Sequence, residues 1–436
     1  MVSGGARKVF DLVKKQEAWR KNCVNLIASE NVMSPCAQAV TMTDFMHRYA
    51  EGLPGKRYYQ GTKFIDELES WAMQLYAEIF EATHADTRPV SGTGANLAVF
   101  MALTQPGDTF FATGVPAGGH ISYEKFGSAG VRGLQIEHYA YDFDNMQIDA
   151  GKSIEAIKEK KPKLVGIGGS LFQFPHPARE FAKAAHDLNV PLWYDIAHVA
   201  GLIAGGKFHK QPFKDGVDFM TMSIHKTFPG PQGGAIVANV KDAQGEERWK
   251  ALQKAVFPGT VSSHHIYRIP PLVITCLEFK EFGKAYAEQI VKNSQALGRH
   301  LSDLGFNVLF KSKGFTESHQ IAVDVSKEGG GRLVGQKLEE ANIILNKNLL
   351  PYDEPNKAVN PSGIRIGSQE MTKFGMKEAE MKRVAELINA VVHENRPPES
   401  VRSEVVEFRR EFQEQGYCFP ESDLKELLEG AEPLAV

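Results

Sequence analysis

The chain is short of cysteine, of uncharged apolar runs and of surplus charge, and each shortage excludes a class of protein. Its cysteines form no CxxC pair and no metal-ligand spacing, which favours reduced thiols over a disulfide framework or a zinc site. A formal net charge of -3 in 436 residues gives no electrostatic reason to expect a nucleic-acid or membrane-surface partner. The four cysteines are Cys23, Cys36, Cys276 and Cys418.

No segment combines the length and the apolar character of a membrane span. The most apolar long run, residues 190–206, contains Asp195 and His198, and burying a charged group in lipid is costly. Residues 1–20 carry charges throughout and lack the apolar core of a secretory signal. We therefore expect a cytoplasmic protein.

Short apolar runs alternate with helical patterns through the middle of the chain. An example of a helical pattern is the amphipathic stretch 178–188. This alternation predicts an α/β fold in which helices sandwich a mostly parallel sheet. The predicted strands are residues 108–115, 163–168, 191–195, 218–223 and 234–240.

After about residue 275 the pattern changes to one that predicts a smaller α+β domain. A long helix is expected at 377–394, where Met381, Val384 and Ile388 share one face. A chain of this length is too long for one compact core. The expected parts are an N-terminal arm (1–40), a large domain (41–285) and a small C-terminal domain (286–436).

Residues 89–96 are the first segment that can carry chemistry. Ser91, Gly92, Thr93 and Gly94 precede an apolar helix, and free N–H groups at a helix start bind phosphate well. An ordinary Ser/Thr helix cap explains the same residues. The segment does not match GxxxxGK[ST], which disfavours ATP.

Two further segments each end a predicted strand with a reactive side chain. Asp195 closes the strand 191–195, where α/β sheets place their ligands, although it can also be a turn cap. Lys226 follows a strand and enters a Gly/Pro-rich loop, residues 229–234. A partly desolvated lysine there can attack carbonyl groups, but most lysines are solvated surface charges.

The three segments together predict a pyridoxal-phosphate site. They supply, in chain order, an anion cradle, a carboxylate that pairs with the pyridine nitrogen and an amine that forms the Schiff base. Arg365 on a short apolar strand suits either a carboxylate clamp or a buried ion pair. Glu51 lies in a tyrosine-rich loop, residues 49–61, that suits either a polar site or a subunit contact.

These segments resemble serine hydroxymethyltransferase. The resemblance runs in order over roughly residues 25–372 and is closest to the archaeal-type branch, notably at 171–177 and 230–232. The matching segments are residues 26–31, 49–59, 118–120, 195–202, 225–227, 346–348 and 362–365.

The resemblance implies a fold-type I pyridoxal-phosphate enzyme that is a homodimer, or a tetramer built from dimers, with shared active sites. It assigns the Schiff base to Lys226, ring stacking to His120, the ring nitrogen to Asp195 and the phenolic oxygen to His198. The implied phosphate and further cofactor contacts are Ser91, Gly92, Thr93, Ser170, Ser223 and His225. The implied substrate and pterin contacts are Ser29, Tyr49, Glu51, Tyr58, Tyr59, Asn348 and Arg365, with Tyr49, Glu51 and Tyr59 coming from the other subunit.

The implied reaction converts serine and tetrahydrofolate, or a related tetrahydropterin, into glycine and the methylene pterin. In this implied reaction the Cα–Cβ bond of serine breaks in an external aldimine. Glu51 transfers the proton of the hydroxyl group or of the one-carbon unit. Three departures from the common pattern concern Gln232, the pair Ser262 and Ser263, and Thr93 with Gly94. A threonine aldolase or transaldolase without folate is the rival reading, and a non-catalytic scaffold is the third.

Overall fold

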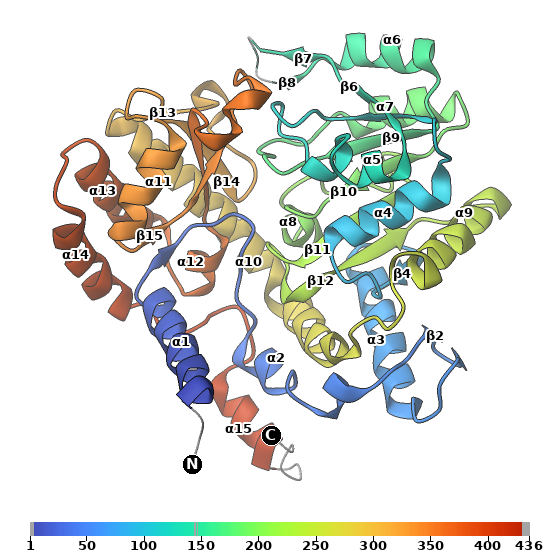
Figure 1. Ribbon diagram of the computed structural model, residues 1–436, viewed down its shortest axis with the longest axis horizontal. Coiled ribbons are helices and arrows are strands. Elements are labelled where there is room, and N and C mark those ends of the chain that lie inside the picture. Colours follow the sequence, from blue (N-terminus) through green and yellow to red (C-terminus); the bar gives the residue numbers. More distant parts are fainter. Residues whose placement is uncertain (1–3, 144, 146, 430–436) are drawn as a thin grey trace. The chain divides into compact units, whose positions relative to one another are not determined.

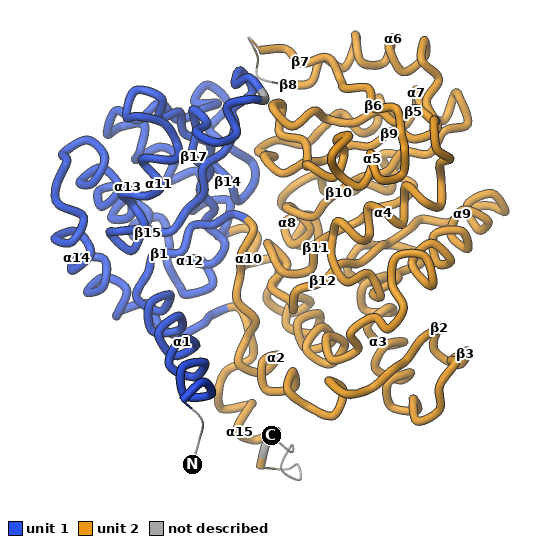
Figure 2. The backbone as a smooth tube through the Cα atoms, in the orientation of Figure 1, with its two compact units in different colours: residues 1–28, 289–416 blue, residues 29–288, 417–436 orange. Residues whose placement is uncertain are grey.

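The computed structural model describes residues 4–143, 145 and 147–429 of the chain, which form two compact units (Figures 1 and 2). Residues 29–288 and 417–436 form one unit, and residues 1–28 and 289–416 form the other. We call them the large unit and the small unit. Residues 1–3 and 430–436, which belonged to the expected arm and small domain, lie outside the described residues.

The large unit is built on a seven-stranded sheet in which only β12 runs against its neighbours. The apolar runs at its centre, β9 to β11, are buried at nearly every residue, which is typical of parallel strands covered on both faces. In sheet order the strands are β4 (His84–Asp86), β12 (Pro229–Ala238), β11 (Phe219–His225), β10 (Leu192–Asp195), β9 (Leu164–Gly168), β5 (Thr109–Ala112) and β6 (Gln135–His138).

Helices cover this sheet and pack their apolar side chains on it. Figure 1 shows α4 and α9 lying together beside β11 and β12, where Phe100 and Leu252 join Trp193 in one buried cluster. The helices of the large unit are α2 (Pro35–Ala39), α3 (Lys63–Ile79), α4 (Gly92–Leu103), α5 (Ser128–Arg132), α6 (Ala150–Lys160), α7 (Ala178–His186), α8 (Ala200–Ala204), α9 (Ala243–Lys254) and α15 (Glu421–Glu429). Two small hairpins, β2 (Gly52–Leu53) with β3 (Lys56–Arg57) and β7 (Tyr141–Asp142) with β8 (Gln147–Ile148), complete it.

The small unit holds a four-stranded antiparallel sheet and its own apolar core, in which Val323, Ile364 and Ile388 are fully or almost fully buried. Its strands in sheet order are β13 (Asn307–Val308), β14 (Gln320–Asp324), β17 (Gly363–Gly367) and β16 (Asn346–Asn348). Its helices are α1 (Gly4–Lys21), α11 (Gly331–Glu340), α12 (Gln369–Lys373), α13 (Glu378–Val392) and α14 (Pro398–Arg410). Helix α10 (Ile269–Asp303) starts in the large unit and continues into the small one.

The chain divides differently from the three parts expected. Residues 1–28 belong to the small unit because β1 (Val24–Asn25) pairs in parallel with β15 (Ile343–Ile344). Residues after Gly416 belong to the large unit, where the Phe419 amide donates to Glu278. No helix in the described residues has both the length and the apolar composition needed to cross a membrane. The expected α/β fold with a mostly parallel, helix-covered sheet is confirmed.

Candidate active site

Asp195 ends β10 and is the most extensively hydrogen-bonded carboxylate of the candidate site. Its side chain is 3% exposed and accepts hydrogen bonds from Nδ2 of Asn96 (2.7 Å), the hydroxyl of Tyr123 (2.8 Å) and the amide of Ala197 (2.9 Å). Three donors favour the negatively charged form of a buried carboxylate. Within the described residues Asp195 forms no ion pair, so the site suits a cationic ligand group such as a protonated pyridine nitrogen.

The start of α4 forms a close cradle with the strands beside it. The hydroxyl of Ser91 caps the helix by accepting from the Gly94 amide at 2.9 Å. A Cβ atom on Gly92 would lie 2.6 Å from the Ser223 hydroxyl, and one on Gly234 would lie 2.3 Å from the Ser91 carbonyl oxygen. Glycine is therefore required at Gly234, where the contact is with backbone, and a side chain at Gly92 would displace Ser223. The N–H groups of the first helical turn suit a phosphate.

Lys226 follows β11 directly and is 8% exposed. Its carbonyl oxygen accepts from Nδ2 of Asn31 at 2.5 Å. The next residue, Thr227, donates to the His198 carbonyl at 2.9 Å and accepts from the Gly201 amide at 3.0 Å. These bonds hold the lysine's own carbonyl group and the residue that follows it, which is the fixed placement that a Schiff-base amine needs.

Several of the predicted residues lie at one edge of the sheet. Asp195 closes β10, Lys226 follows β11 and Ser170 follows β9, and these three strands are parallel neighbours. Parallel strands present their carboxyl ends on the same side, where α/β sheets bind ligands. The buried negative charge and the glycine-lined cradle therefore match the two ends of pyridoxal phosphate.

The imidazoles near this edge are held in defined orientations. Burial and the adjacent Lys226 ammonium lower the pKa of His225 to about 4, so its ring is neutral at pH 7. Nδ1 of His225 accepts from the Gly233 amide at 3.2 Å, which leaves the proton on Nε2, where it can be donated to an anion. Nδ1 of His120 lies 2.8 Å from the Ser122 hydroxyl, and His198 is 3% exposed.

The loop that carries Glu51 contacts a different part of the large unit. Ser262 donates a short hydrogen bond to the Glu51 carboxylate, so one of the serines that departs from the family pattern contacts it. The rings of Tyr58 and Phe257 are 5.7 Å apart, and those of Tyr49 and Tyr59 are 5.5 Å apart. None of the contacts described for these four predicted residues reaches Lys226 or Asp195 in the same chain.

A buried ionic cluster anchors this loop. Arg57 donates to the carbonyl oxygens of Ala50 (2.6 Å) and Gly52 (2.9 Å), and it pairs with Asp66 (2.7 Å) and with Glu69. The fully buried Glu69 carboxylate also lies 3.1 Å from Nε2 of His264, whose side chain is 1% exposed. The cluster connects α3, the Glu51 loop and the segment after Ser262.

Two predicted substrate residues lie in the small unit. Arg365 is in β17 and Asn348 is at the end of the neighbouring β16. Nε of Arg365 donates to Oδ1 of Asn346 at 3.2 Å. Burial lowers the pKa of Arg365 to about 10, which leaves the guanidinium charged at neutral pH and able to bind a carboxylate. Ser29 starts the large unit.

Sequence reasoning assigned no role to Asn96 and Tyr123, although both donate to Asp195. Asn96 lies at the end of the predicted phosphate segment, and Tyr123 comes three residues after His120. Their sequence spacing does not predict a contact with Asp195, because they reach it only when α4 and the β5–β6 connection pack onto β10.

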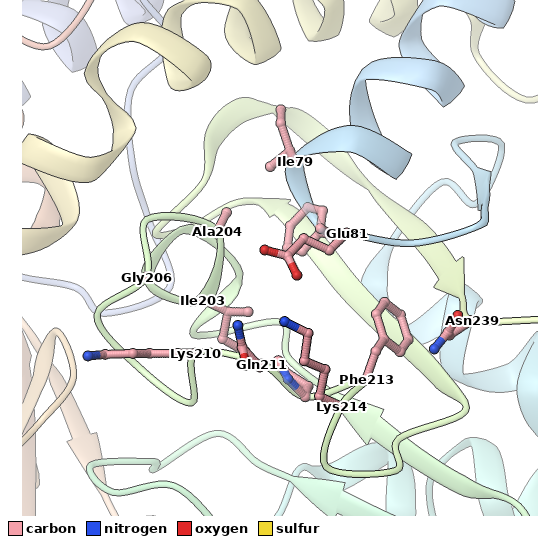
Figure 3. Close-up of a pocket in the computed structure, with 12 residues that line it drawn as sticks. Ile79, Glu81, Ile203, Ala204, Gly206, Lys210, Gln211, Phe213, Lys214 and Asn239 are labelled. Atoms are coloured by element: carbon pink, nitrogen blue, oxygen red, sulfur yellow. The ribbon is translucent and has the colours of Figure 1, made fainter.

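Two cavities in the large unit lie apart from the Asp195 edge. The first, shown in Figure 3, has a volume of about 230 Å³ and is lined by Glu81, Lys210 and Lys214 among others, but by no predicted site residue. The second has a volume of about 350 Å³ and is lined by residues 45–49, 262–263 and 265–267. It includes Tyr49 together with the departing serines Ser262 and Ser263.

Comparisons with known proteins agree with this geometry. The family model described as serine hydroxymethyltransferase matches residues 2–388. Serine hydroxymethyltransferase of Saccharolobus islandicus (strain M.14.25 / Kamchatka #1) is 50% identical over 421 residues, covering 96% of this chain and 95% of the relative. That of Methanocella arvoryzae is 49% identical over 419 residues, covering 96% and 97%. The crystal structure of L-threonine transaldolase from Pseudomonas fluorescens, in its internal aldimine state, matches with a TM-score of 0.87 at 27% identity, covering 98% of this chain and 97% of that chain.

The fold and the site define a fold-type I pyridoxal-phosphate enzyme. Lys226, the Asp195 carboxylate and the cradle at Gly92 all fit that cofactor. The chain belongs to the serine hydroxymethyltransferase family. The expected likeness to the archaeal-type branch is confirmed by its relatives.

Proposed function

We propose that this chain interconverts serine and glycine, with tetrahydrofolate or a related tetrahydropterin carrying the one-carbon unit. The observation that carries the proposal is the joint placement of buried Lys226 and hydrogen-bonded Asp195 at one sheet edge, in a chain whose full-length relatives are serine hydroxymethyltransferases. When bound, pyridoxal phosphate supplies an electron-poor ring that accommodates the electron pair left by Cα–Cβ cleavage.

Different residues of the site are proposed to bind different parts of the cofactor. Lys226 is proposed as the amine that holds the cofactor covalently, and Asp195 as the partner of its ring nitrogen. His120 and His198 are proposed to contact the ring. The proposed phosphate contacts are Ser91, Gly92, Thr93, Ser223 and His225, and Ser170 lies at the same edge.

The substrate residues come from three places. Arg365 is proposed to bind the amino-acid carboxylate, with Ser29 assisting, because its charged guanidinium suits two-point recognition of that group. Glu51 is proposed to move the proton of the substrate hydroxyl, with Tyr49 and Tyr59 beside it. Tyr58 and Asn348 are proposed pterin contacts.

We further propose a homodimer in which Glu51, Tyr49 and Tyr59 act in the partner's site. Three tyrosines on one loop are unusually exposed for aromatic side chains, at 55% for Tyr49, 72% for Tyr58 and 43% for Tyr59. The same loop is anchored by the Arg57–Glu69 pair, so its exposed face is presented rigidly. An exposed aromatic patch of this kind is typical of a subunit contact. None of the four cysteines, all of which lie in the described residues, forms a disulfide bond, and this supports a cytoplasmic location.

A substrate comparison tests the activity and separates it from that of the transaldolase neighbour. The purified protein, supplied with pyridoxal phosphate, is incubated with serine with or without tetrahydrofolate, and separately with threonine plus an aromatic aldehyde. We expect glycine from serine only when tetrahydrofolate is present. If glycine forms only from threonine, and tetrahydrofolate has no effect, the chain would be assigned to aldehyde transfer instead.

A further inference from the structure

Tyr123 and Asn96 form a buried polar shell behind Asp195. Tyr123 is 1% exposed, and its hydroxyl donates to Oδ2 of Asp195 at 2.8 Å. Its ring packs edge-on against Trp193 (5.5 Å between centroids) and Phe110 (6.1 Å). Asn96, also 1% exposed, donates to the same Oδ2 atom at 2.7 Å. One carboxylate oxygen therefore receives two side-chain hydrogen bonds.

The orientation of the Asn96 amide follows from a chain of one-way hydrogen bonds. The indole Nε1 of Trp193 can only donate, and it lies 2.8 Å from the Thr221 hydroxyl. The Thr221 hydroxyl donates its own proton to Oδ1 of Asn96, at 2.7 Å. Because Oδ1 is the acceptor in that bond, the Asn96 NH₂ group must face Asp195.

Tyr123 is the second side-chain donor to Asp195. Complete burial and the nearby Asp195 carboxylate raise the pKa of the Tyr123 hydroxyl well above its usual value, so it keeps its proton. The other oxygen of Asp195, Oδ1, accepts the Ala197 amide at 2.9 Å. Each of these donors favours a carboxylate over a carboxylic acid, and none of them carries a positive charge.

We propose that Tyr123, together with Asn96 and Thr221, is a positioning residue that holds the Asp195 carboxylate fixed in direction toward the cofactor nitrogen. The proposal rests on the proposed function only in taking Asp195 as the partner of that nitrogen. These residues act through Asp195 and are not expected to touch the substrate.

Tyr123→Phe tests the proposal, because it removes the hydroxyl and keeps the packed ring. Tyr139→Phe is the matched control: Tyr139 is also buried, and its hydroxyl donates to the Gly166 carbonyl at 3.0 Å. Both variants lose one buried hydrogen bond, so we expect similar falls in melting temperature. Only Tyr123→Phe is expected to raise the dissociation constant of pyridoxal phosphate, by roughly tenfold in titrations of the apoprotein.

The kinetic readout separates positioning from simple structural damage. Tyr123→Phe is expected to lower kcat about tenfold with the KM for serine unchanged within about twofold, since substrate contacts remain. Thr221→Val, which conserves volume and removes the hydroxyl that orients Asn96, is expected to shift both cofactor affinity and kcat in the same direction. Tyr139→Phe should leave both within about twofold of the unmodified protein.

Equal cofactor affinity and kcat in Tyr123→Phe and Tyr139→Phe would overturn the proposal. If Thr221→Val leaves the cofactor affinity unchanged, the role of the hydrogen-bond chain through Asn96 is refuted. The contribution of Tyr123 is then decided by Tyr123→Phe alone. An unmodified protein that binds pyridoxal phosphate but does not convert serine with tetrahydrofolate would refute the proposed activity alone. The affinity comparison would still decide the role of Tyr123.

Discussion

At the residue scale, Glu51 has the most sharply testable assignment. Glu51→Gln keeps the size and the ability to accept from Ser262, but it removes the exchangeable carboxylate. We expect the tetrahydrofolate-dependent formation of glycine to fall by at least about a hundredfold, because a positioned acid–base group contributes about 10²–10⁴ in rate. The change in visible absorbance when serine is added to the holoenzyme should persist. Loss of that change as well would show that Glu51 serves amino-acid binding instead.

His176 is a partly buried histidine whose titration affects the stability of the fold. Burial lowers its pKa from 6.5 to about 3, and its Nδ1 accepts from the Gly168 amide at 3.1 Å. Between pH 6.5 and pH 3 the unfolded chain binds a proton at this residue and the folded chain does not. The folded state therefore loses stability as the pH falls through that window.

His176→Asn removes this titration and retains an acceptor for the Gly168 amide. We expect the unfolding free energy of the variant, measured by urea denaturation, to decline less steeply between pH 6.5 and pH 4 than that of the unmodified protein. Parallel declines in the two proteins would show that His176 titrates normally in the folded state.

At the element scale, the cluster of Arg57, Glu69 and His264 joins helix α3 to the Glu51 loop. Glu69→Ala leaves the Arg57 guanidinium buried without its fully buried partner, and breaking such a pair costs about 3–5 kcal/mol. We expect a corresponding loss of stability, and faster hydrogen exchange at residues 49–61. Asp44→Ala, which removes an exposed i,i+4 pair with Arg48, is the control and should change neither measurement. Unchanged exchange in Glu69→Ala would mean that the loop is held by other contacts.

The elements themselves followed the sequence pattern closely at the centre of the fold. The runs at 163–168 and 191–195 are β9 and β10, because strands buried on both faces must be almost wholly apolar. The long helix α10, Ile269–Asp303, begins just before two prolines. Pro270 and Pro271 stand in its first turn, where proline is tolerated because no N–H partner is lost.

At the scale of the whole molecule, the central prediction is a shared active site. Lys226→Met and Glu51→Gln each disable one contribution to a site. If Glu51 serves the partner's site, a mixed dimer of the two variants has one site with both changes and one site with neither. Random exchange of subunits should then restore about a quarter of the original activity, since half of the dimers are mixed and each has one intact site.

The measurement is serine cleavage after the two inactive variants have been mixed, partly unfolded and refolded together. The control is each variant treated alone, which should remain inactive. Activity that stays at the level of the separate variants, in a preparation shown to contain mixed dimers, would place Glu51 in its own chain's site. Sedimentation of the unmodified protein should give a dimer or a multiple of it.

The exposed face of α1 bears on whether the protein forms a dimer. The helix has no buried residue, and its apolar side chains Val9, Phe10, Leu12 and Val13 are all more than half exposed. Burying such side chains is favourable, so a helix of this kind favours a contact with another chain. We expect these side chains to be covered by the second subunit of the dimer.

The α/β class, the positions of Asp195 and Lys226 at strand ends, and the family could all be predicted from the sequence. These features depend on local periodicity and on contiguous motifs, which a linear reading records. Only the tertiary structure brought Asn96 and Tyr123 to Asp195 and joined Ser262 to Glu51. The partners in these contacts are separated by 72 to 211 residues, and no local pattern encodes a pairing between side chains that meet only when distant segments pack.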